Sequence, residues 1–327
     1  MTIDDVAKEL NISKTTVSRA ISGKGRISES TRSKVLAYIK EHNFKPSLIA
    51  KGLAEKRTYN IAVVWPADYD YVDLPFFQSC VMGMSKAAAE QDTDILICMV
   101  KGNDIGELDR IVENHKVDGV ILTRTLINDA PADYLLSQNF PFVAIGSTED
   151  KRTITVDNDH YEACRELTSI LALRKVGRIA LLGGNTNHII TRTRYRGYID
   201  GLKNAGIEPD EDIVYFDVDS EPRMARILAE LKKKEIGCAI CMDDMICELF
   251  LTCTRKEGIS IPKDMRVASF YDSRVLTNAN PSITALHFED RHLGQRAADM
   301  LLRLINGESV ENEVLSDYEV ILKESTK

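Results

Sequence analysis

The 327-residue sequence predicts a small all-α head joined to a larger α/β core, in which two lobes each hold a doubly wound parallel sheet. The N-terminal segment has helical periodicity and capping residues but no strand pattern. Beyond Arg57, short apolar runs alternate with helical stretches, which is typical of parallel sheets covered on both faces. Eleven such runs are too many for one compact lobe of this length, so we expect two similar lobes. The expected strands are Ile61–Trp65, Asp94–Val100, Gly119–Thr123, Phe142–Gly146, Thr153–Asp157, Arg178–Gly183, Ile213–Val218, Cys238–Met242, Met265–Phe270, Ile283–Phe288 and Tyr318–Leu322.

The first two helices of the head are separated by a break too short for a strand. Val6, Ala7 and Leu10 share one helical face. Ser13 is a suitable N-cap for a second helix, and Gly23 is a suitable end for it. Two short helices across such a turn predict a helix-turn-helix, whose second helix lies in the major groove of DNA.

A third helix is expected over about residues 30–41. Its apolar residues Val35, Leu36 and Ile39 are predicted to lie on the face that closes the core of the head.

The outward surface of the second helix carries groups that suit a DNA duplex. Lys14, Thr15 and Arg19 are placed to reach base edges, and Arg19 can pair bidentately with a guanine. Hydroxyl groups that can contact phosphate oxygens and set the register come from Ser13, Thr16 and Ser18.

The alternative role for this surface is a solvated face of a small bundle, and the charge distribution argues against that alternative. Residues 1–58 carry 12 Lys and Arg against 6 Asp and Glu, whereas the rest of the chain carries 30 against 44. A basic head on an acidic protein predicts binding to double-stranded DNA.

The run DDVAKELNISKTTVSRAISGKGRISESTRSKVLAYIKEHNFKPSLIAKGL resembles the head of the lactose/galactose-repressor family of bacterial transcription regulators. TVSRAISG and the following R-x-x-V-x-x-x-I are specific to that family, and the resemblance extends over almost the whole chain. It implies that Lys14, Thr15 and Arg19 read bases and that Leu53 is a wedge in the minor groove. It also implies a core with the fold of periplasmic sugar-binding proteins and a ligand between the lobes.

A hinge is expected between the head and the core. Pro46 stops the third helix, and Ser47 can cap a short helix over residues 48–54. Such a helix is marginal alone in water, and Gly52 weakens it by up to about 1 kcal/mol. We expect it to fold on a bent operator with Leu53 from two copies in the minor groove. The alternative is that its apolar side chains pack on the core.

The resemblance also supplies the domain bounds. The head is residues 1–45, and the hinge helix and linker are residues 46–58. The N-terminal lobe is residues 59–158 plus 289–314, and the C-terminal lobe is residues 159–288 plus 315–327. The chain is expected to cross between lobes near Asp157–His160, near His287–Asp290 and after Glu313. Loops after the strands are the expected ligand site, because open α/β sheets bind ligands at the carboxyl ends of their strands.

Three residues of the ligand site follow from matches to family motifs. R-Y-R-G-Y matches R-x-x-G-[FY], which implies that Arg194 contacts the effector through its planar guanidinium. Asp243 stands where the family usually has Asn, although it can equally cap the helix that begins at Met245. Thr123 matches another position that lines the pocket.

Further stretches depart from the family pattern. In S-F-Y-D, Tyr271 takes the place of an acid that holds sugar hydroxyls in many members, and Asp272 follows one residue later. The strand that ends near Ile145 commonly leads to an acid, but Gly146 and Ser147 follow it here. Phe288 occupies a position that is often polar. We expect Tyr271, Asp272 and Phe288 to contact the effector. These departures predict a less polyhydroxylated ligand or a reshaped sugar pocket.

The loop ADYDYVDLPFF is longer than usual for the family. Its Tyr69, Tyr71 and Phe76 are candidates for stacking on a ring of the ligand, although loop aromatics also pack on their own lobe.

Signals for other classes of protein are weak. The chain has neither a G-x-S-x-G elbow nor a phosphate-binding P-loop motif, so no enzyme and no cofactor are expected. Cys238 and Cys241 lie three apart in an apparent strand and so point to opposite faces, which favours core packing over a metal site. No signal peptide or membrane span is expected, and seven Cys, an odd number, suit a reducing cytoplasm.

The sequence therefore predicts a cytoplasmic, homodimeric transcriptional repressor that binds a specific operator. Its operator affinity is expected to depend on a small effector, a sugar or sugar derivative. The alternative keeps the DNA role and places it under a phosphocarrier-type protein partner or a non-sugar ligand such as a nucleoside or purine.

Overall fold

The computed structural model describes residues 1–23, 25–44, 52, 55–68 and 75–327. The chain divides into two compact units, Met1–Tyr59 and Asn60–Lys327, and each is described by itself. The expected hinge helix with Leu53 lies outside the described residues except for Gly52. Tyr69 and Tyr71 also lie outside them.

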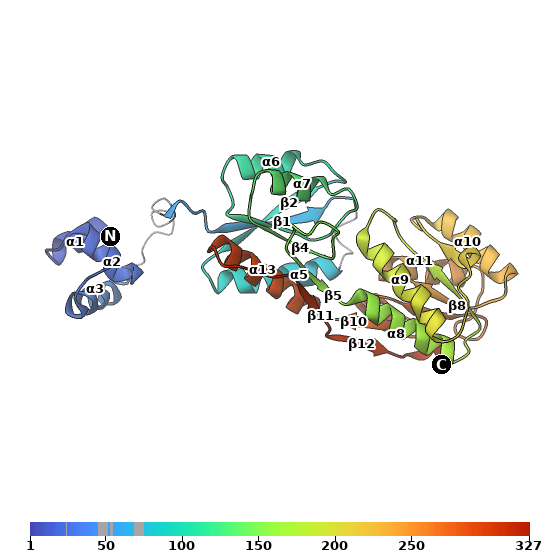
Figure 1. Ribbon diagram of the computed structural model, residues 1–327. Coiled ribbons are helices and arrows are strands. Elements are labelled where there is room, and N and C mark those ends of the chain that lie inside the picture. Colours follow the sequence, from blue (N-terminus) through green and yellow to red (C-terminus); the bar gives the residue numbers. More distant parts are fainter. Residues whose placement is uncertain (24, 45–51, 53–54, 69–74) are drawn as a thin grey trace. The chain divides into compact units, whose positions relative to one another are not determined.

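The head consists of helices α1 (Ile3–Glu9), α2 (Lys14–Ser22) and α3 (Glu29–Glu41) (Figure 1). The N-cap expected for the second helix is confirmed, because the Ser13 hydroxyl accepts a hydrogen bond from the Thr16 N–H. Gly23 ends α2 in the left-handed conformation at φ +71°.

A small core joins the three helices of the head. Its buried members are Val6, Ala7, Val17, Ala20 and Val35. Ile39 packs against this cluster, whereas the prediction that Leu36 does so is wrong, since its side chain is 45% exposed. One residue along a helix turns the side chain by about 100°, so Val35 and Leu36 do not share a face.

The first sheet of the larger unit is fully parallel and runs in the order β11-β5-β4-β3-β1-β2. Its strands are β1 (Asn60–Pro66), β2 (Asp94–Val100), β3 (Gly119–Leu122), β4 (Phe142–Ile145), β5 (Thr155–Asn158) and β11 (Glu313–Leu315). In Figure 1, α6 (Gly106–Glu113) and α7 (Ala130–Ser137) cover one face, and α5 (Pro75–Ala89) and α13 (Asp290–Ile305) cover the other.

The second sheet runs in the order β12-β10-β9-β8-β6-β7. Its strands are β6 (Arg178–Leu182), β7 (Val214–Tyr215), β8 (Ile236–Cys241), β9 (Arg266–Ser269), β10 (Thr284–Phe288) and β12 (Tyr318–Ile321). The helices are α8 (His160–Leu173), α9 (Ile189–Asn204), α10 (Glu221–Lys233), α11 (Asp244–Lys256) and α12 (Arg274–Thr277), with 3₁₀ turns at Glu211–Ile213 and Glu324–Thr326. Helices α8 and α9 pack against each other, as do α10 and α11.

The chain passes between the two sheets at three crossings, in the regions that the resemblance implies. Strand β5 leads into α8, β10 leads into α13, and β11 leads into β12. We did not expect β11, because a three-residue, partly polar strand has too little periodicity to be recognised.

Strand β12 pairs antiparallel with β10, whereas the other pairings of its sheet are parallel. The carboxyl ends of both sheets face the cleft between the lobes. A chain that leaves the carboxyl end of β11 and enters the other sheet after two residues therefore runs against its new neighbours.

Candidate functional site

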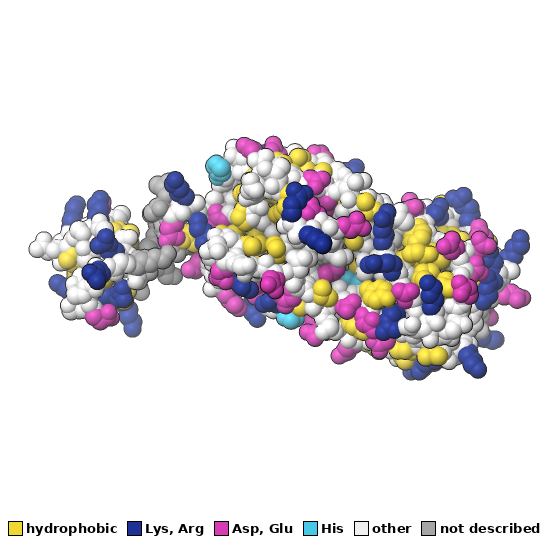
Figure 2. All heavy atoms as spheres, viewed as in Figure 1, with side chains coloured by type: hydrophobic (Ala, Val, Ile, Leu, Met, Phe, Trp, Pro, Cys, Tyr) yellow, Lys and Arg dark blue, Asp and Glu magenta, His cyan; other side chains and the backbone are white. Residues whose placement is uncertain are grey.

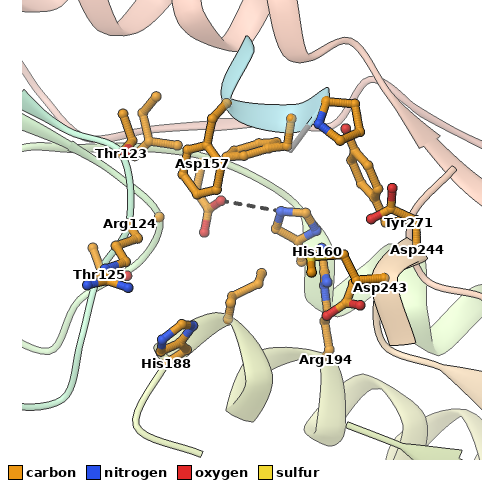
Figure 3. A pocket seen from close by; sticks show the side chains of 17 residues that line it. Thr123, Arg124, Thr125, Asp157, His160, His188, Arg194, Asp243, Asp244 and Tyr271 are labelled. Atoms are coloured by element: carbon orange, nitrogen blue, oxygen red, sulfur yellow. Dashed lines mark ion pairs between the residues drawn. The ribbon is translucent and has the colours of Figure 1, made fainter. Parts of the chain in front are cut away.

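A pocket of about 180 Å³ lies where the carboxyl ends of strands from both lobes meet (Figure 3). Figure 3 shows Thr123, Arg124 and Thr125 on one side, and Asp243, Asp244 and Tyr271 on the other. The lining residues are Pro75, Phe76, Phe77, Thr123, Arg124, Thr125, Ile145, Gly146, Asp157, His160, His188, Ile190, Arg194, Asp243, Asp244, Met245 and Tyr271.

Arg194 projects into the pocket from α9, and its guanidinium is partly engaged by the protein. Its Nη1 donates a hydrogen bond to the carbonyl of Met242 at the end of β8. Its Nε is buried and has no hydrogen-bond partner among the described residues. A backbone contact thus orients the guanidinium and leaves part of its donor capacity for a bound molecule.

Asp243 both caps a helix and lines the pocket, the two roles that its position in the sequence allowed. It is the N-cap of α11, where its carboxylate accepts a hydrogen bond from the Ile246 N–H at 2.8 Å, and it also lines the pocket. Burial raises its pKa, and burial together with the neighbouring charge of Asp243 raises the pKa of Asp244 to about 6. Two adjacent carboxyl groups therefore offer acceptors to donor groups of a ligand.

Asp157 is a third acid of the pocket, and sequence reasoning did not select it. It lies at the end of β5, it is only 8% exposed, and burial raises its pKa to about 7. The Nε2 of His160 lies 3.7 Å from its carboxylate. Burial and the charge of Arg194 hold the pKa of His160 well below its usual value, so the imidazole is neutral and the contact is not a salt bridge.

Aromatic rings form the apolar wall of the pocket. Phe76 packs edge-on against Phe77 and against Tyr271, with ring centroids 5.1 and 6.2 Å apart. The Tyr271 hydroxyl donates a hydrogen bond to Asp290, the first residue of α13. These rings provide flat surfaces suited to a sugar ring or another planar group.

The wall opposite the acids is held by internal contacts. The Thr123 hydroxyl donates a hydrogen bond to the Val64 carbonyl at 2.6 Å, which links the ends of β3 and β1. Arg124 forms an ion pair with Asp68 at 2.6 Å, and the Arg124 side chain is 16% exposed. Both residues thus shape the pocket while their polar groups are already partnered.

A short backbone contact joins the lobes beside the pocket. The Ile127 N–H donates to the Asn187 carbonyl at 3.0 Å, and the Ile189 N–H donates to the Thr125 carbonyl at 3.3 Å. We call these two hydrogen bonds the lobe clasp. Between them lies His188, and burial followed by the charge of Arg124 lowers its pKa to about 4. The clasp ties the loop after β3 to the start of α9.

Two of the expected effector residues do not line the pocket. Asp272 is turned toward Lys323, whose Nζ lies 3.3 Å from its carboxylate, and Thr277 donates a hydrogen bond to it. Phe288 is 4% exposed and packs behind His160. The displacement of Asp272 has a physical reason, because successive residues after a strand point to opposite sides and Tyr271 takes the inward position.

The pocket also contains residues that the motifs did not indicate, among them Asp157, His160, Phe77 and His188. The sequence does contain a feature that points to Asp157, because this acidic residue lies at the carboxyl end of an expected strand and at an expected crossing between the lobes. No comparable signal exists for His188, since it reaches the pocket only through the clasp between lobes.

The second helix of the head exposes a polar surface. The side chains of Lys14, Thr15, Ser18 and Arg19 are exposed, whereas Val17 is fully buried. Figure 2 shows Lys and Arg side chains spread over the visible face of the head, with few acidic ones. Ser13 and Thr16, two of the expected phosphate contacts, share a hydrogen bond between their hydroxyls at 2.8 Å.

The base-reading candidate Lys14 forms an ion pair within this surface, because its amine contacts the Asp4 carboxylate of α1. The pair is largely exposed and so costs little to open when DNA binds.

The cysteines are buried thiols in the core. Cys238 and Cys241 both lie in β8, and burial raises their pKa values. Within the described ranges, no group of three or more His, Cys, Asp or Glu is arranged to hold a metal ion. Nor does that part of the chain contain a helix long and apolar enough to span a membrane.

Comparison with known families matches both units. Residues 58–323 match the family described as periplasmic binding proteins and sugar binding domain of LacI family. Residues 2–47 match bacterial regulatory proteins, lacI family.

Relatives align along nearly the whole chain. The HTH-type transcriptional regulator MalR of Streptococcus pneumoniae is 29% identical over 315 residues, which cover 94% of this chain and 93% of that protein. The regulator CelR of Thermobifida fusca is 28% identical over 319 residues, which cover 95% and 93%.

Solved structures share the same architecture. The structure of a transcriptional regulator CelR–cellobiose complex superposes with a TM-score of 0.74 at 26% identity and covers 99% of both chains. A Lac repressor dimer bound to operator and the anti-inducer ONPF gives a TM-score of 0.77 at 23% identity, covering 100% of this chain and 99% of that one, which supports the fold alone.

Proposed function

The chain belongs to the LacI family of bacterial regulatory proteins, and from this premise we propose that it is a repressor controlled by a small effector in the pocket between its lobes. It is a DNA-binding transcriptional regulator with a helix-turn-helix head and a core of the sugar-binding type. The relatives are named as regulators, and we assign no catalytic role to the acids of the pocket. A protein that binds the chromosome acts in the cytoplasm.

The effector is a sugar or sugar derivative. One observation carries this assignment: polar side chains and aromatic rings from both lobes converge on one cavity of about 180 Å³. Ligand pockets of drug-sized molecules begin at about 300 Å³, so this cavity suits a ligand of about one ring. Arg194, Asp243 and Tyr271 are the proposed contacts from one lobe, and Phe76 and Thr123 from the other. A molecule touching both lobes changes their relation, and operator affinity shifts only by its differential affinity for the two states.

The head binds the operator through α2. We assign base contacts to Lys14, Thr15 and Arg19, and we expect Leu53 to enter the minor groove. Exposure of the α2 surface and the positive charge of the head support this assignment.

A homodimer is the proposed state, because a pseudo-palindromic operator needs two heads. Ile97 and Met99 are exposed on edge strand β2, and Met82 is exposed on the neighbouring α5. An apolar edge of this kind suits burial against a second copy. Sedimentation that gives only monomer for the full chain would contradict this assignment, and Ile97→Lys should weaken a dimer that forms.

A thermal-shift screen of the full chain against sugars, sugar phosphates, polyols, nucleosides and purine bases tests the effector assignment. A ligand at about 100 times its Kd stabilises the fold by roughly 2.7 kcal/mol. A sugar that stabilises the wild type but not Arg194→Ala supports the proposal. If only a nucleoside or purine, or only a phosphocarrier protein, produces a response, that molecule and not a sugar would be assigned as the effector.

Operator selection from random DNA tests the head. The selected site should lose affinity by about 1–3 kcal/mol with Arg19→Ala, because a bidentate contact to a base is lost. The control is Lys34→Ala, at an exposed position on α3. Its operator affinity should fall by no more than the loss of one phosphate contact would cause.

A further inference from the structure

Each of the three crossings between the lobes carries an aromatic ring, and the ring of the second crossing packs against the other two. His160 is the first residue of α8 after the first crossing, Phe288 ends β10 before the second, and Tyr318 begins β12 after the third. The ring centroids of His160 and Phe288 are 4.5 Å apart, and those of Phe288 and Tyr318 are 6.3 Å apart. Both separations lie within the range of favourable aromatic pairs. We call these residues the crossing stack.

Only one member of the crossing stack lines the pocket, and that member is His160. Hydrogen bonds do not fix its ring, because Nε2 is 3.7 Å from the Asp157 carboxylate and Nδ1 is buried without a partner among the described residues. A separation of this size is too long for a hydrogen bond. Packing against Phe288 therefore sets the position of the imidazole.

The other two members are tied to the framework of the C-terminal lobe. Phe288 and Tyr318 are register partners in the antiparallel pair of β10 and β12. The Tyr318 hydroxyl donates a hydrogen bond of 2.7 Å to Glu166, which lies on α8 six residues after His160. The crossing stack thus connects the segments that join the lobes with the helix that follows the first of them.

We propose that His160 contacts the bound effector, and that a shift of its ring on binding is transmitted to all three crossings through Phe288 and Tyr318. The inference rests on the proposed function in one respect, namely that the effector occupies the pocket. Protein interiors are close-packed, so a shift of the His160 ring must be accommodated by the ring behind it. The crossings are the covalent links between the lobes, and their backbone determines how the lobes are related. A neutral imidazole suits an effector that presents uncharged hydroxyl groups.

Phe288→Leu tests the transmission step. The variant keeps an apolar side chain and removes the ring, and the matched control is Phe142→Leu in β4, a buried position outside the crossing stack. Operator affinity is measured with and without the sugar identified in the thermal-shift screen. We expect the ratio of the two affinities to shrink by about two- to tenfold in Phe288→Leu and not in the control, as the strength of an aromatic contact implies. An unchanged ratio in Phe288→Leu overturns the proposal.

Hydrogen exchange of the full chain without DNA or ligand tests the crossing stack independently of the effector. Phe288→Leu should raise exchange by about two- to tenfold at residues 157–161 as well as around residue 288. Phe142→Leu should leave residues 157–161 unchanged. A rise confined to the neighbourhood of residue 288 overturns the coupling, even when the wild type binds operator and effector normally.

His160→Phe separates the two roles of the imidazole. The variant keeps a ring for the crossing stack and loses both nitrogens, so exchange at the crossings should match that of the wild type while sugar binding weakens. Unchanged sugar binding would overturn the contact with the effector. A wild type without operator affinity, or one that no small molecule affects, would instead count against the proposed function, and the exchange result would still decide whether the crossings are coupled.

Discussion

The Tyr271 hydroxyl donates a hydrogen bond of 2.5 Å to the Asp290 carboxylate and so joins the two lobes at the back of the pocket. Tyr271 follows β9 of the C-terminal lobe, whereas Asp290 opens α13, which covers the sheet of the N-terminal lobe. Burial raises the pKa of Asp290 to about 6, and the hydrogen bond from Tyr271 opposes that rise. Tyr271, which stands where many family members have an acidic residue, thus forms a hydrogen bond with an acidic residue of the other lobe.

Removal of this hydroxyl should destabilise the core. Tyr271→Phe leaves the Asp290 carboxyl buried without its donor, and we expect the free energy of unfolding to fall by about 1–3 kcal/mol at pH 7. The loss should be smaller at pH 5, where more of the carboxyl is protonated. Urea unfolding at both pH values measures it, and equal losses at both would contradict the role of the charge.

The buried acids predict a stability that falls as pH rises. The folded-state pKa of Asp157 is raised to about 7 from an unfolded value of 3.8, so the folded state holds the proton more tightly. Its contribution is complete below pH 4 and is lost as pH rises through 7, with a slope of up to about 1.4 kcal/mol per pH unit. Asp157→Asn should flatten the unfolding profile between pH 4 and 7. Asp133→Asn, at an exposed site of α7, should leave the profile parallel to that of the wild type.

One hydrogen bond of the lobe clasp can be removed by a substitution that α9 tolerates. Ile189 is the first residue of the helix and follows an extended His188, so proline fits this position and removes only the N–H that donates to Thr125. Ile189→Pro should weaken effector binding by about two- to tenfold and lower the exchange protection of the Ile127 amide. Arg274→Pro, at the first position of α12, is the control. If the Ile127 amide stays fully protected in Ile189→Pro, the hydrogen bond of Ile189 is not needed to hold the lobe clasp together.

Helices α5 and α13 approach so closely that Gly83 and Gly294 at their contact have no room for a side chain. A Cβ on Gly294 would lie 2.0 Å from the Cys80 carbonyl oxygen, and one on Gly83 would lie 2.0 Å from that of Arg291. Gly294→Ala should therefore lower the free energy of unfolding by about 1–3 kcal/mol, because the helices must move apart. In the control Gly106→Ala, the new Cβ meets only the Asp104 side chain at 3.3 Å. Thermal unfolding compares them, and similar melting temperatures would contradict the packing argument.

Local features of the fold follow from short stretches of sequence. Ser13 and Gly23 bound α2 because capping depends on a few neighbouring residues. The apolar strands were recognisable because both faces of a parallel sheet are buried. Leu36 shows the limit, since an apolar residue one position beyond a core face resembles its neighbour in sequence and yet is exposed.

Membership of the pocket was decided by tertiary structure. Asp157 and His160 line it, whereas Asp272 and Phe288 do not, although we expected the latter pair to contact the effector. A side chain enters the pocket only if its strand end, its orientation and the opposite lobe all bring it there. These conditions depend on three crossings, of which the first lies more than a hundred residues before the other two along the chain, and no local pattern encodes them.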